Sequence, residues 1–330
     1  EIGFFVQDEW NVTPKLTVVP GIRIDSHSSG EEYTTSVKVS DSAFPTTKFS
    51  KTTVNPRIAI KYELTPSLVL RANVGSGFRA PYGFSEDLHL CSGSPRVWKS
   101  SNLKGERAIS YNLSADYYAK KYQFSINIFR TNLKDKIQFS PADDEVKKFG
   151  YSYQWENVDD AYVQGVELGA KANLFRNFTA GVNWTFNQGK FKHERADWSD
   201  PNDETVKEFP QRLQYAKDSR NISRFPAMTG DIDLDYTPGT WTFSLTSSLQ
   251  GRMYIDYNSE DNGATSKIKK TNTFMLFNCR AAKRFGMCTV YAGAKNIFSY
   301  IQDEKHTDDA AFMYAPVYGA TWYVGLSVKL

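Results

Sequence analysis

Apolar and polar residues alternate with a period of two along most of this chain. Between Phe178 and Asn187 every second residue is apolar, and the residues between them are Thr, Gly or Asn. The last segment, from Ala320 to Leu330, shows nearly the same pattern. Because successive side chains of a strand point to opposite faces, this alternation predicts strands with one apolar face and one wet face.

Traced from end to end, the alternation predicts an all-β protein with about thirteen strands. We expect these strands near 1–10, 16–27, 51–63, 67–77, 106–119, 122–133, 150–174, 177–190, 222–237, 240–257, 270–285, 287–301 and 313–330. No apolar run approaches the roughly 18 residues of a membrane helix, so a helical membrane protein is excluded. A membrane β-barrel is not excluded, because its strands are only half apolar.

Short and long connections alternate between these strands. Short turns are predicted at 11–15, 65–66, 120–121, 175–177, 237–239 and 285–286. Long polar loops are predicted near 28–50, 78–105, 134–149, 191–221, 258–269 and 302–312. Short turns at one end and long loops at the other are typical of a transmembrane antiparallel β-barrel, in which the long loops are extracellular.

A soluble β-sandwich is the alternative fold, since its strands alternate too. Sandwich strands average about 5–6 residues, whereas several strands here run to about 12 or more. The strand that starts at Asp231 places Ile232 and Leu234 on one face and its aspartates on the other. A barrel would set the apolar residues against lipid and the aspartates in a hydrated lumen, so we favour the barrel.

Composition and charge narrow the function. The 330 residues include 40 Lys and Arg against 37 Asp and Glu, a net charge of +3, which argues against a nucleic-acid partner. The three cysteines form neither a disulfide framework nor a zinc site; Cys279 and Cys288 share parity with apolar neighbours and are predicted to face outward, with a cross-strand disulfide left open. The four histidines are far apart, and no nucleophile elbow or phosphate loop is present, so we predict neither enzymatic activity nor a cofactor.

Thirteen strands are an odd number, whereas antiparallel bacterial barrels close with an even one. An open edge in a bilayer would leave backbone groups unpaired. The chain also starts inside a predicted strand, without a signal peptide. Either one strand is missing from this count or further strands lie upstream of Glu1, and the start inside a strand favours the second alternative.

Four segments, taken in order, resemble motifs of the TonB-dependent outer-membrane receptors. Gly77-Phe78-Arg79-Ala80-Pro81 resembles the F-R-A-P box, and Asn102-Leu103-Lys104-Gly105-Glu106 resembles the N-P-N-L-K-P-E segment. Gln164-Gly165-Val166-Glu167-Leu168 resembles the G-V-E-L segment, and Lys295-Asn296-Ile297-Phe298 the closing N-L-F segment. The resemblance spans residues 1–330. It departs from the pattern at Ser100-Ser101, where the N-P pair is missing, and at Leu330, where Phe is usual.

The resemblance implies a 22-stranded barrel around an N-terminal plug, of which residues 1–330 would be the C-terminal part. Such a receptor lies in the outer membrane of a Gram-negative bacterium. It binds a scarce metal chelate (a ferric siderophore, haem or cobalamin) at extracellular loops and imports it with energy from TonB, which acts through the plug and TonB box upstream. Outer-membrane lipid, lipopolysaccharide and a surface lipoprotein are further candidate partners. The alternative function is a plug-less, porin-like diffusion channel.

Candidate binding residues follow from the resemblance. His89 lies between the first two motifs, where haem receptors of the family carry an axial-ligand candidate; the alternative is a solvated loop histidine. The other ligand-binding candidates are Arg79, Tyr82, Trp98 and Trp198, and Cys91 is a nearby soft donor. The acidic segment 197–204 is either a calcium site or a solvated loop.

Charged side chains that alternate with the apolar ones are predicted to face the lumen, where they would meet the plug or simply hydrate the wall. This set comprises Arg71, Glu167, Lys171, Asp231, Asp233 and Asp235, together with Arg23, Asp25, Arg57, Lys61 and Asp116. Aromatic residues placed near strand ends, among them Tyr117, Trp184, Trp241 and Trp322, are predicted to form interfacial girdles.

Overall fold

The computed structural model describes residues 1–32, 46–81, 97–100, 102–149, 151, 153–193, 220–258, 266–302 and 313–329. A single 15-stranded sheet dominates this part of the chain, and thirteen of its strands follow one another in an unbroken antiparallel path. The path comprises β1 (Ile2–Gln7), β3 (Leu16–Glu31), β4 (Thr47–Thr65), β5 (Leu68–Arg79), β7 (Glu106–Tyr118), β8 (Tyr122–Pro141), β9 (Tyr153–Phe175), β10 (Phe178–Phe191), β11 (Met228–Tyr236), β12 (Trp241–Gln250), β15 (Phe274–Phe285), β16 (Cys288–Lys295) and β17 (Thr321–Val328). The thirteen strands predicted from the alternation are therefore confirmed.

Four shorter strands and one helix complete the described structure. β2 (Trp10–Thr13) pairs with β3, and β6 (Val97–Lys99) runs parallel to β9. β13 (Tyr254–Asn258) and β14 (Ser266–Lys270) form a separate hairpin. The four-residue helix α1 (Asp144–Lys147) begins after Asp143, whose carboxylate accepts a hydrogen bond from the Val146 N–H. In the described part of the chain no helix is long and apolar enough to cross a membrane.

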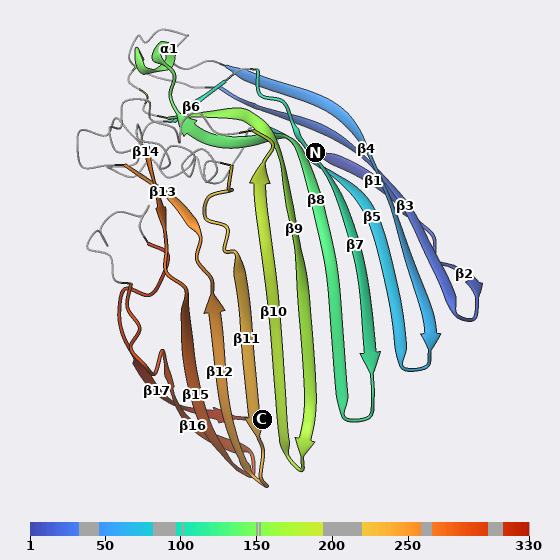
Figure 1. The fold of residues 1–330 in the computed structure, drawn as a ribbon, viewed down its shortest axis with the longest axis vertical. Coiled ribbons are helices and arrows are strands. Elements are labelled where there is room, and N and C mark those ends of the chain that lie inside the picture. Colours follow the sequence, from blue (N-terminus) through green and yellow to red (C-terminus); the bar gives the residue numbers. More distant parts are fainter. Residues whose placement is uncertain are drawn as a thin grey trace, which may run out of the picture.

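The sheet has two different ends, which we call the turn end and the loop end (Figure 1). At the turn end, drawn at the bottom, tight turns join β4 to β5, β7 to β8, β9 to β10, β11 to β12 and β15 to β16. At the loop end lie α1, β6, β13 and β14. Along the path, β1 and β17 are the two outermost strands.

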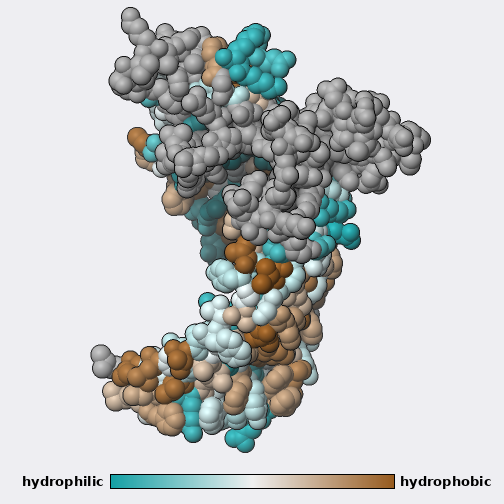
Figure 2. Space-filling view, turned by 90° about the vertical axis from the view of Figure 1, so that its left-hand side faces the viewer, coloured by the Kyte–Doolittle hydropathy of each residue, from teal (hydrophilic) through white to brown (hydrophobic). Residues whose placement is uncertain are grey.

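The strand register gives the sheet one polar face and one apolar face. Asn73, Asn112 and Asn127 lie on the polar face, where Asn73 is opposite Asn112. Leu113 and Ile128 are opposite each other on the apolar face and are 57% and 51% exposed. In Figure 2 pale and teal side chains line the middle of the hollow of the curved sheet, and tan ones lie on the opposite side. Large apolar residues are thus left uncovered along the apolar face.

Two predicted strands are interrupted in the structure. The predicted strand 240–257 divides at 251–253, and 270–285 divides at 271–273, because β13 and β14 pair with each other instead of continuing the sheet. Met253, just before β13, is buried with Phe274 and Tyr314 in a small apolar cluster at the loop end. The side chains of this cluster come from distant parts of the sequence, so the local pattern did not predict the break.

The predicted strands 287–301 and 222–237 are also shorter in the structure. β16 ends at Lys295 because Asn296 adopts a positive φ of 50°, which a strand cannot contain. Its amide then caps the turn: Asn296 Nδ2 donates to the Tyr300 carbonyl at 2.7 Å, and Asn296 Oδ1 accepts from the Tyr300 N–H at 2.9 Å. β11 begins at Met228, and the residues before it cross to other strands, where the Arg224 N–H donates to the Tyr254 carbonyl.

Candidate functional site

The predicted lumen residues all lie on the polar face of the sheet. Arg71 on β5 donates a hydrogen bond from Nη1 to Oδ2 of Asp116 on β7. Glu167 on β9 accepts from Nδ2 of Asn127 on β8 at 2.9 Å. Lys171, four residues further along β9, stands opposite Gln123 and Gly181. This face therefore carries charges of both signs, several of them paired.

Asp231, Asp233 and Asp235 form an acidic ladder along β11. Asp231 Oδ2 accepts from Asn183 Nδ2 at 2.9 Å, and Asp235 Oδ1 accepts from the Ser244 hydroxyl at 2.6 Å. The neighbouring partners are thus neutral amide and hydroxyl groups, whereas Asp25 on β3 is paired with Arg23 at 2.7 Å. The polar face is consequently charge-balanced near β3 and more negative at β11.

Two motif segments that are separate in sequence contact each other at the loop end. We call these contacts, of Arg79 with Glu106 and of Phe78 with Gly105, the clasp. Arg79 lies directly opposite Glu106, and Arg79 Nη1 is 3.6 Å from Glu106 Oε2. The buried Glu106 also accepts the Ile137 N–H through Oε1 at 2.6 Å, which ties β7 to β8. The ring of Phe78 lies so close to Gly105 that a Cβ at position 105 would overlap it. The F-R-A-P box and the segment ending at Glu106 are therefore packed against each other.

Asn157 on β9 holds the same segment from the other side. Its Oδ1 accepts the Lys104 N–H at 2.8 Å, and its Nδ2 donates to the carbonyls of Lys104 and Asp135 at 3.0 and 2.8 Å. In the G-V-E-L segment, a Cβ on Gly165 would meet the Phe129 ring and the Phe186 carbonyl. These motif residues thus have packing roles that the structure shows directly.

His27 is a residue whose surroundings sequence reasoning missed. The predicted strand 16–27 ends at His27, beside the predicted loop 28–50, whereas in the structure His27 lies within β3 and is 6% exposed. Its Nε2 is 3.3 Å from the Thr53 hydroxyl, and its ring centroid is 4.9 Å from that of Phe78. Its shared parity with Arg23 and Asp25 was the available signal, because all three lie on the polar face.

At the loop end of β9, Asp159 is bound to His193, which follows β10. The His193 N–H donates to Asp159 Oδ2 at 2.6 Å, and His193 Nδ1 is 3.1 Å from Asp159 Oδ1. Burial opposes ionisation of Asp159, but the hydrogen bonds from the His193 backbone and ring outweigh it and lower the pKa of this carboxyl from its usual value. The pair fastens the ends of two neighbouring strands.

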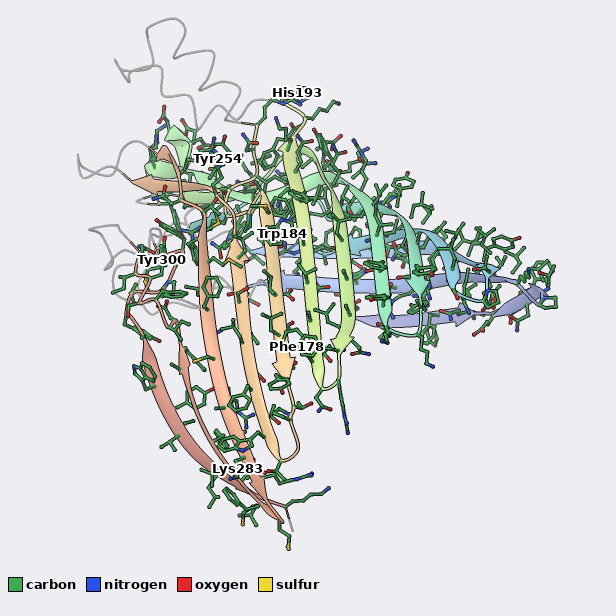
Figure 3. All side chains as sticks on the ribbon, turned by 60° about the horizontal axis from the view of Figure 1, so that its bottom comes forward. Phe178, Trp184, His193, Tyr254, Lys283 and Tyr300 are labelled. Atoms are coloured by element: carbon green, nitrogen blue, oxygen red, sulfur yellow. The ribbon has the colours of Figure 1, made fainter. Side chains whose placement is uncertain are left out.

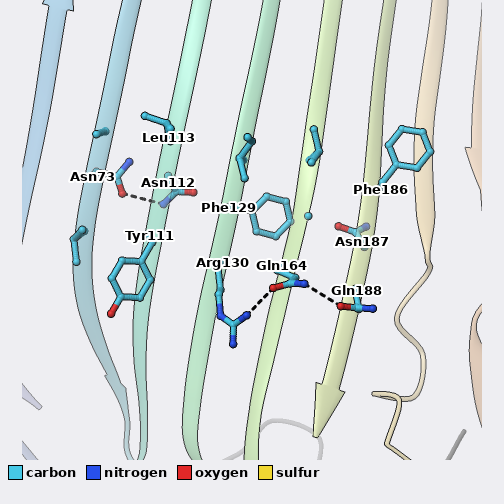
Figure 4. A pocket seen from close by; sticks show the side chains of 15 residues that line it. Asn73, Tyr111, Asn112, Leu113, Phe129, Arg130, Gln164, Phe186, Asn187 and Gln188 are labelled. Atoms are coloured by element: carbon cyan, nitrogen blue, oxygen red, sulfur yellow. Dashed lines mark hydrogen bonds between the residues drawn. The ribbon is translucent and has the colours of Figure 1, made fainter. Parts of the chain in front are cut away.

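The apolar face becomes polar at one row of residues near the loop end (Figure 4). Arg130 Nη1 donates to Gln164 Oε1 at 2.7 Å, and Gln164 Nε2 donates to Gln188 Oε1 at 2.9 Å. On β9 the same face carries only apolar residues from Val166 to Leu174 on the turn-end side of this row. The row thus marks the limit of the apolar band on its loop-end side.

Aromatic rings gather at the limit of that band on its turn-end side. Phe175 stacks on Phe178 with centroids 4.7 Å apart, and Trp241 stacks on Phe243 at 5.5 Å. Lys283 Nζ lies 4.8 Å from the Trp241 centroid, and Figure 3 shows Lys283 at the turn end. The predicted position of Trp184 near a strand end is wrong, because it lies in the middle of β10, opposite Leu168.

Of the predicted ligand-binding residues, Arg79 and Trp98 are described. Trp98 on β6 is opposite Gln154, and its indole Nε1 is buried without a hydrogen-bond partner in the described residues. His89, Tyr82, Cys91 and Trp198, and the acidic segment 197–204, lie outside the described residues. Within the described ranges no cluster of His, Cys, Asp and Glu is arranged to hold a metal ion.

Cys279 and Cys288 are both free thiols. Cys279 is opposite Leu245 and Ala294, and Cys288 is opposite Phe285 and Val328, so the two are not cross-strand partners. Both lie among the residues of the apolar face, as predicted. The disulfide that the sequence left open is absent between these two residues.

Long antiparallel strands in sequential order, with one apolar and one polar face, define the wall of a transmembrane β-barrel. Residues 1–297 match the family described as "TonB dependent receptor-like, beta-barrel", and the chain belongs to this family. Barrels of this family are outer-membrane proteins of Gram-negative bacteria. The resemblance inferred from the four motif segments is therefore confirmed.

Curated relatives of the chain are named as transporters and receptors. It is 27% identical over 229 residues to the vitamin B12 transporter BtuB of Photobacterium profundum, covering 68% of this chain and 30% of that protein. It is 25% identical over 204 residues to a ferric enterobactin receptor of Pseudomonas aeruginosa, covering 56% and 24%. The chain thus spans about a third or less of these two relatives. Such names agree with the prediction that it is not an enzyme.

Solved structures show the same fold. The copper transporter OprC aligns over 99% of this chain and 47% of its own, with a TM-score of 0.71 and 20% identity. The ferric citrate transporter FecA in its unliganded form aligns over 99% and 44%, with a TM-score of 0.68 and 20% identity. At this level of identity the likeness establishes the architecture of the wall.

Proposed function

We propose that this chain forms part of the barrel wall of an outer-membrane receptor that imports a scarce metal chelate with energy supplied through TonB. One observation supports this most strongly. In a chain of this family, one face of the sheet is polar from the turn end to the loop end, and the opposite face is apolar and uncovered. The apolar face then meets lipid, and the long connections of the loop end face the cell exterior.

In this function the polar face lines a lumen occupied by a plug from another part of the full-length protein. Arg71, Glu167 and Lys171 would contact the plug through a mixed-sign surface, and Asp231, Asp233 and Asp235 through a negative one. Pairs such as Arg71 and Asp116 already satisfy each other within the wall. A plug can therefore shift along these charges without leaving buried wall groups unpaired.

The substrate classes are a ferric siderophore, haem or cobalamin. Cobalamin and ferric enterobactin are the substrates in the names of two relatives, which supports a chelate of this kind. Among the described candidates, Trp98 has a buried indole N–H that could donate a hydrogen bond to a ligand. Arg79 is already paired with Glu106 in the clasp. Outer-membrane lipid, lipopolysaccharide and a surface lipoprotein are partners proposed from the family alone.

Uptake by the full-length protein tests this function. Cells that express it as the sole receptor would be given radiolabelled ferric enterobactin, haem or cyanocobalamin, with and without functional TonB. We expect accumulation of one of these three substrates, and only in cells with TonB. Uptake that is equal without TonB, together with a large steady conductance in planar bilayers, would instead identify a plug-less, porin-like channel.

The haem assignment has its own test at His89. If His89 is an axial ligand, H89A in the full-length protein should weaken haem binding and change the Soret spectrum of the complex. Unchanged haem affinity in H89A would remove the support for haem and leave the siderophore and cobalamin classes.

A further inference from the structure

Basic residues accumulate on the outward-facing, apolar side of the sheet just above the apolar band. Arg107 on β7 and Lys134 on β8 lie directly opposite each other, and both are exposed. They share the parity of Ile109 and Asn132, so they point away from the polar face. Two like charges at directly opposed positions repel each other, so an anion between them would stabilise this part of the sheet.

These two residues belong to a groove of about 770 Å³ bounded on one side by residues 53–56 of β4. We define the basic groove by its five cationic lining residues, which are Arg107, Arg130, Lys134, Lys192 and Arg220. Of the described residues that line it, one is acidic, Asp160. Among the described residues, none of the five cations forms an ion pair, whereas Arg23, Arg71 and Arg79 on the polar face each have a carboxylate partner.

Arg130 is held in place by neutral groups. Its Nε donates to Asn132 Oδ1 at 2.9 Å, its Nη1 donates to Gln164 Oε1 at 2.7 Å, and its Cζ lies 4.5 Å from the centroid of the Tyr162 ring. These contacts orient the guanidinium and leave its charge uncompensated. A guanidinium has five N–H donors, so further donors remain for an anionic oxygen.

The basic groove is continuous with the apolar band below it. One row toward the turn end from Arg130 and Gln164, the same face carries Ile128 and Val166. Phosphate groups in the groove would therefore place attached acyl chains along an apolar surface, at the depth where tyrosine rings such as Tyr162 favour a membrane interface. Free phosphate would use the cations but not the apolar rows.

We propose that the basic groove binds the phosphate groups of a phosphorylated membrane lipid whose acyl chains lie on the apolar face. This inference rests on the proposed function, because it requires the apolar face to be embedded in the membrane. It goes beyond that function by assigning a lipid headgroup to named residues on the outer face of the wall.

The test measures lipid binding to the full-length protein in neutral detergent by native mass spectrometry. The probes are bisphosphorylated lipid A, its dephosphorylated counterpart and inorganic phosphate. The double variant R107Q/K134Q is compared with K283Q, which removes a cation from the same face at the turn end, over Trp241. We expect the wild type and K283Q to bind bisphosphorylated lipid A equally, and R107Q/K134Q to bind it about tenfold more weakly or worse.

Three results would overturn the inference. These are equal affinity of R107Q/K134Q and wild type, equal affinity of the wild type for phosphorylated and dephosphorylated lipid, and complete competition by millimolar inorganic phosphate. Heat-modifiable mobility on gels verifies that each variant is folded. Substrate uptake separates the two proposals. R107Q/K134Q should retain TonB-dependent uptake. If the wild type binds the lipid but shows no such uptake, the result counts against the proposed function alone.

Discussion

Arg79 and Glu106 face each other across β5 and β7, and they join two motifs by which the chain resembles its family. Glu106 also binds the Ile137 N–H, so one carboxylate connects three consecutive strands of the path, β5, β7 and β8. A motif at the loop end of a receptor invites a ligand-binding interpretation. In this structure its described residues first hold the wall together.

Substitution of Glu106 should weaken the loop end of the wall. E106A removes the acceptor of a buried backbone N–H, and we expect a loss of roughly 1–3 kcal/mol in the free energy of unfolding. E106Q keeps an acceptor oxygen and should lose less. Urea unfolding of the detergent-solubilised full-length protein measures both. Equal stability of E106A and wild type would show that the clasp contributes nothing.

Asn296 should be sensitive to both its backbone conformation and its amide. N296G keeps access to the positive φ of 50° but loses the two bonds to Tyr300, whereas N296A loses both advantages. We expect the order wild type, N296G, N296A in decreasing stability, with about 1 kcal/mol between the two variants. Limited proteolysis between β16 and β17 reports the same order. If N296A is the more stable variant, the conformational argument is wrong.

The two faces of β10 should respond in opposite ways to a new charge. Val182 lies on the apolar face and Asn183 on the polar face, where it contacts Asp231. V182R should cost roughly 2–4 kcal/mol if it lies near the bilayer midplane, and N183R should be nearly neutral. Folding titrations into lipid vesicles compare the two variants. A similar cost for both would contradict the assignment of the faces.

The bond between Asp159 and His193 should make stability depend on pH. Asp159 lies on the loop-end side of the Gln164 row, and its folded-state pKa is lowered, so ionised Asp159 stabilises the folded state. This contribution is complete above the unfolded pKa of about 4 and disappears as pH falls through the folded value. The stability difference between wild type and D159N should be full at pH 6 and shrink below about pH 4. A difference that does not change with pH would contradict the prediction.

The alternation of side chains predicted most of the fold. A strand with lipid on one face and water on the other needs apolar residues at every second position and polar residues between them. The parity of Asp231 and Ile232 was enough to assign their faces, and the motifs were enough to indicate the family. Contacts made across long sequence separations were not predictable in the same way. Asn157 holds Lys104, and Met253 leaves the sheet to join Tyr314, without any local signal in the chain.

The candidate site was harder to predict than the wall. Arg79 and Trp98 were named from their nearness to motifs, yet the partner of Arg79 became visible only from the strand register. His27 was hidden because a polar residue at the end of an alternating run looks like the start of a loop. The basic groove was not predictable from the sequence, because Arg107 and Lys134 come together only through the pairing of β7 with β8.

The length of the apolar stretch on β9 sets a preferred membrane thickness. Val166 to Leu174 covers about 30 Å along the strand at roughly 3.3 Å per residue. With a strand tilt of about 40°, that stretch projects to roughly 23 Å along the membrane normal, against about 30 Å for an ordinary hydrocarbon core. A mismatch of several ångströms repeated around a barrel is costly in a thick bilayer, and bacterial outer membranes are thinner than average. The number of residues between Gln164 and the aromatic residues at the turn end therefore favours insertion into a thin membrane over a thick one.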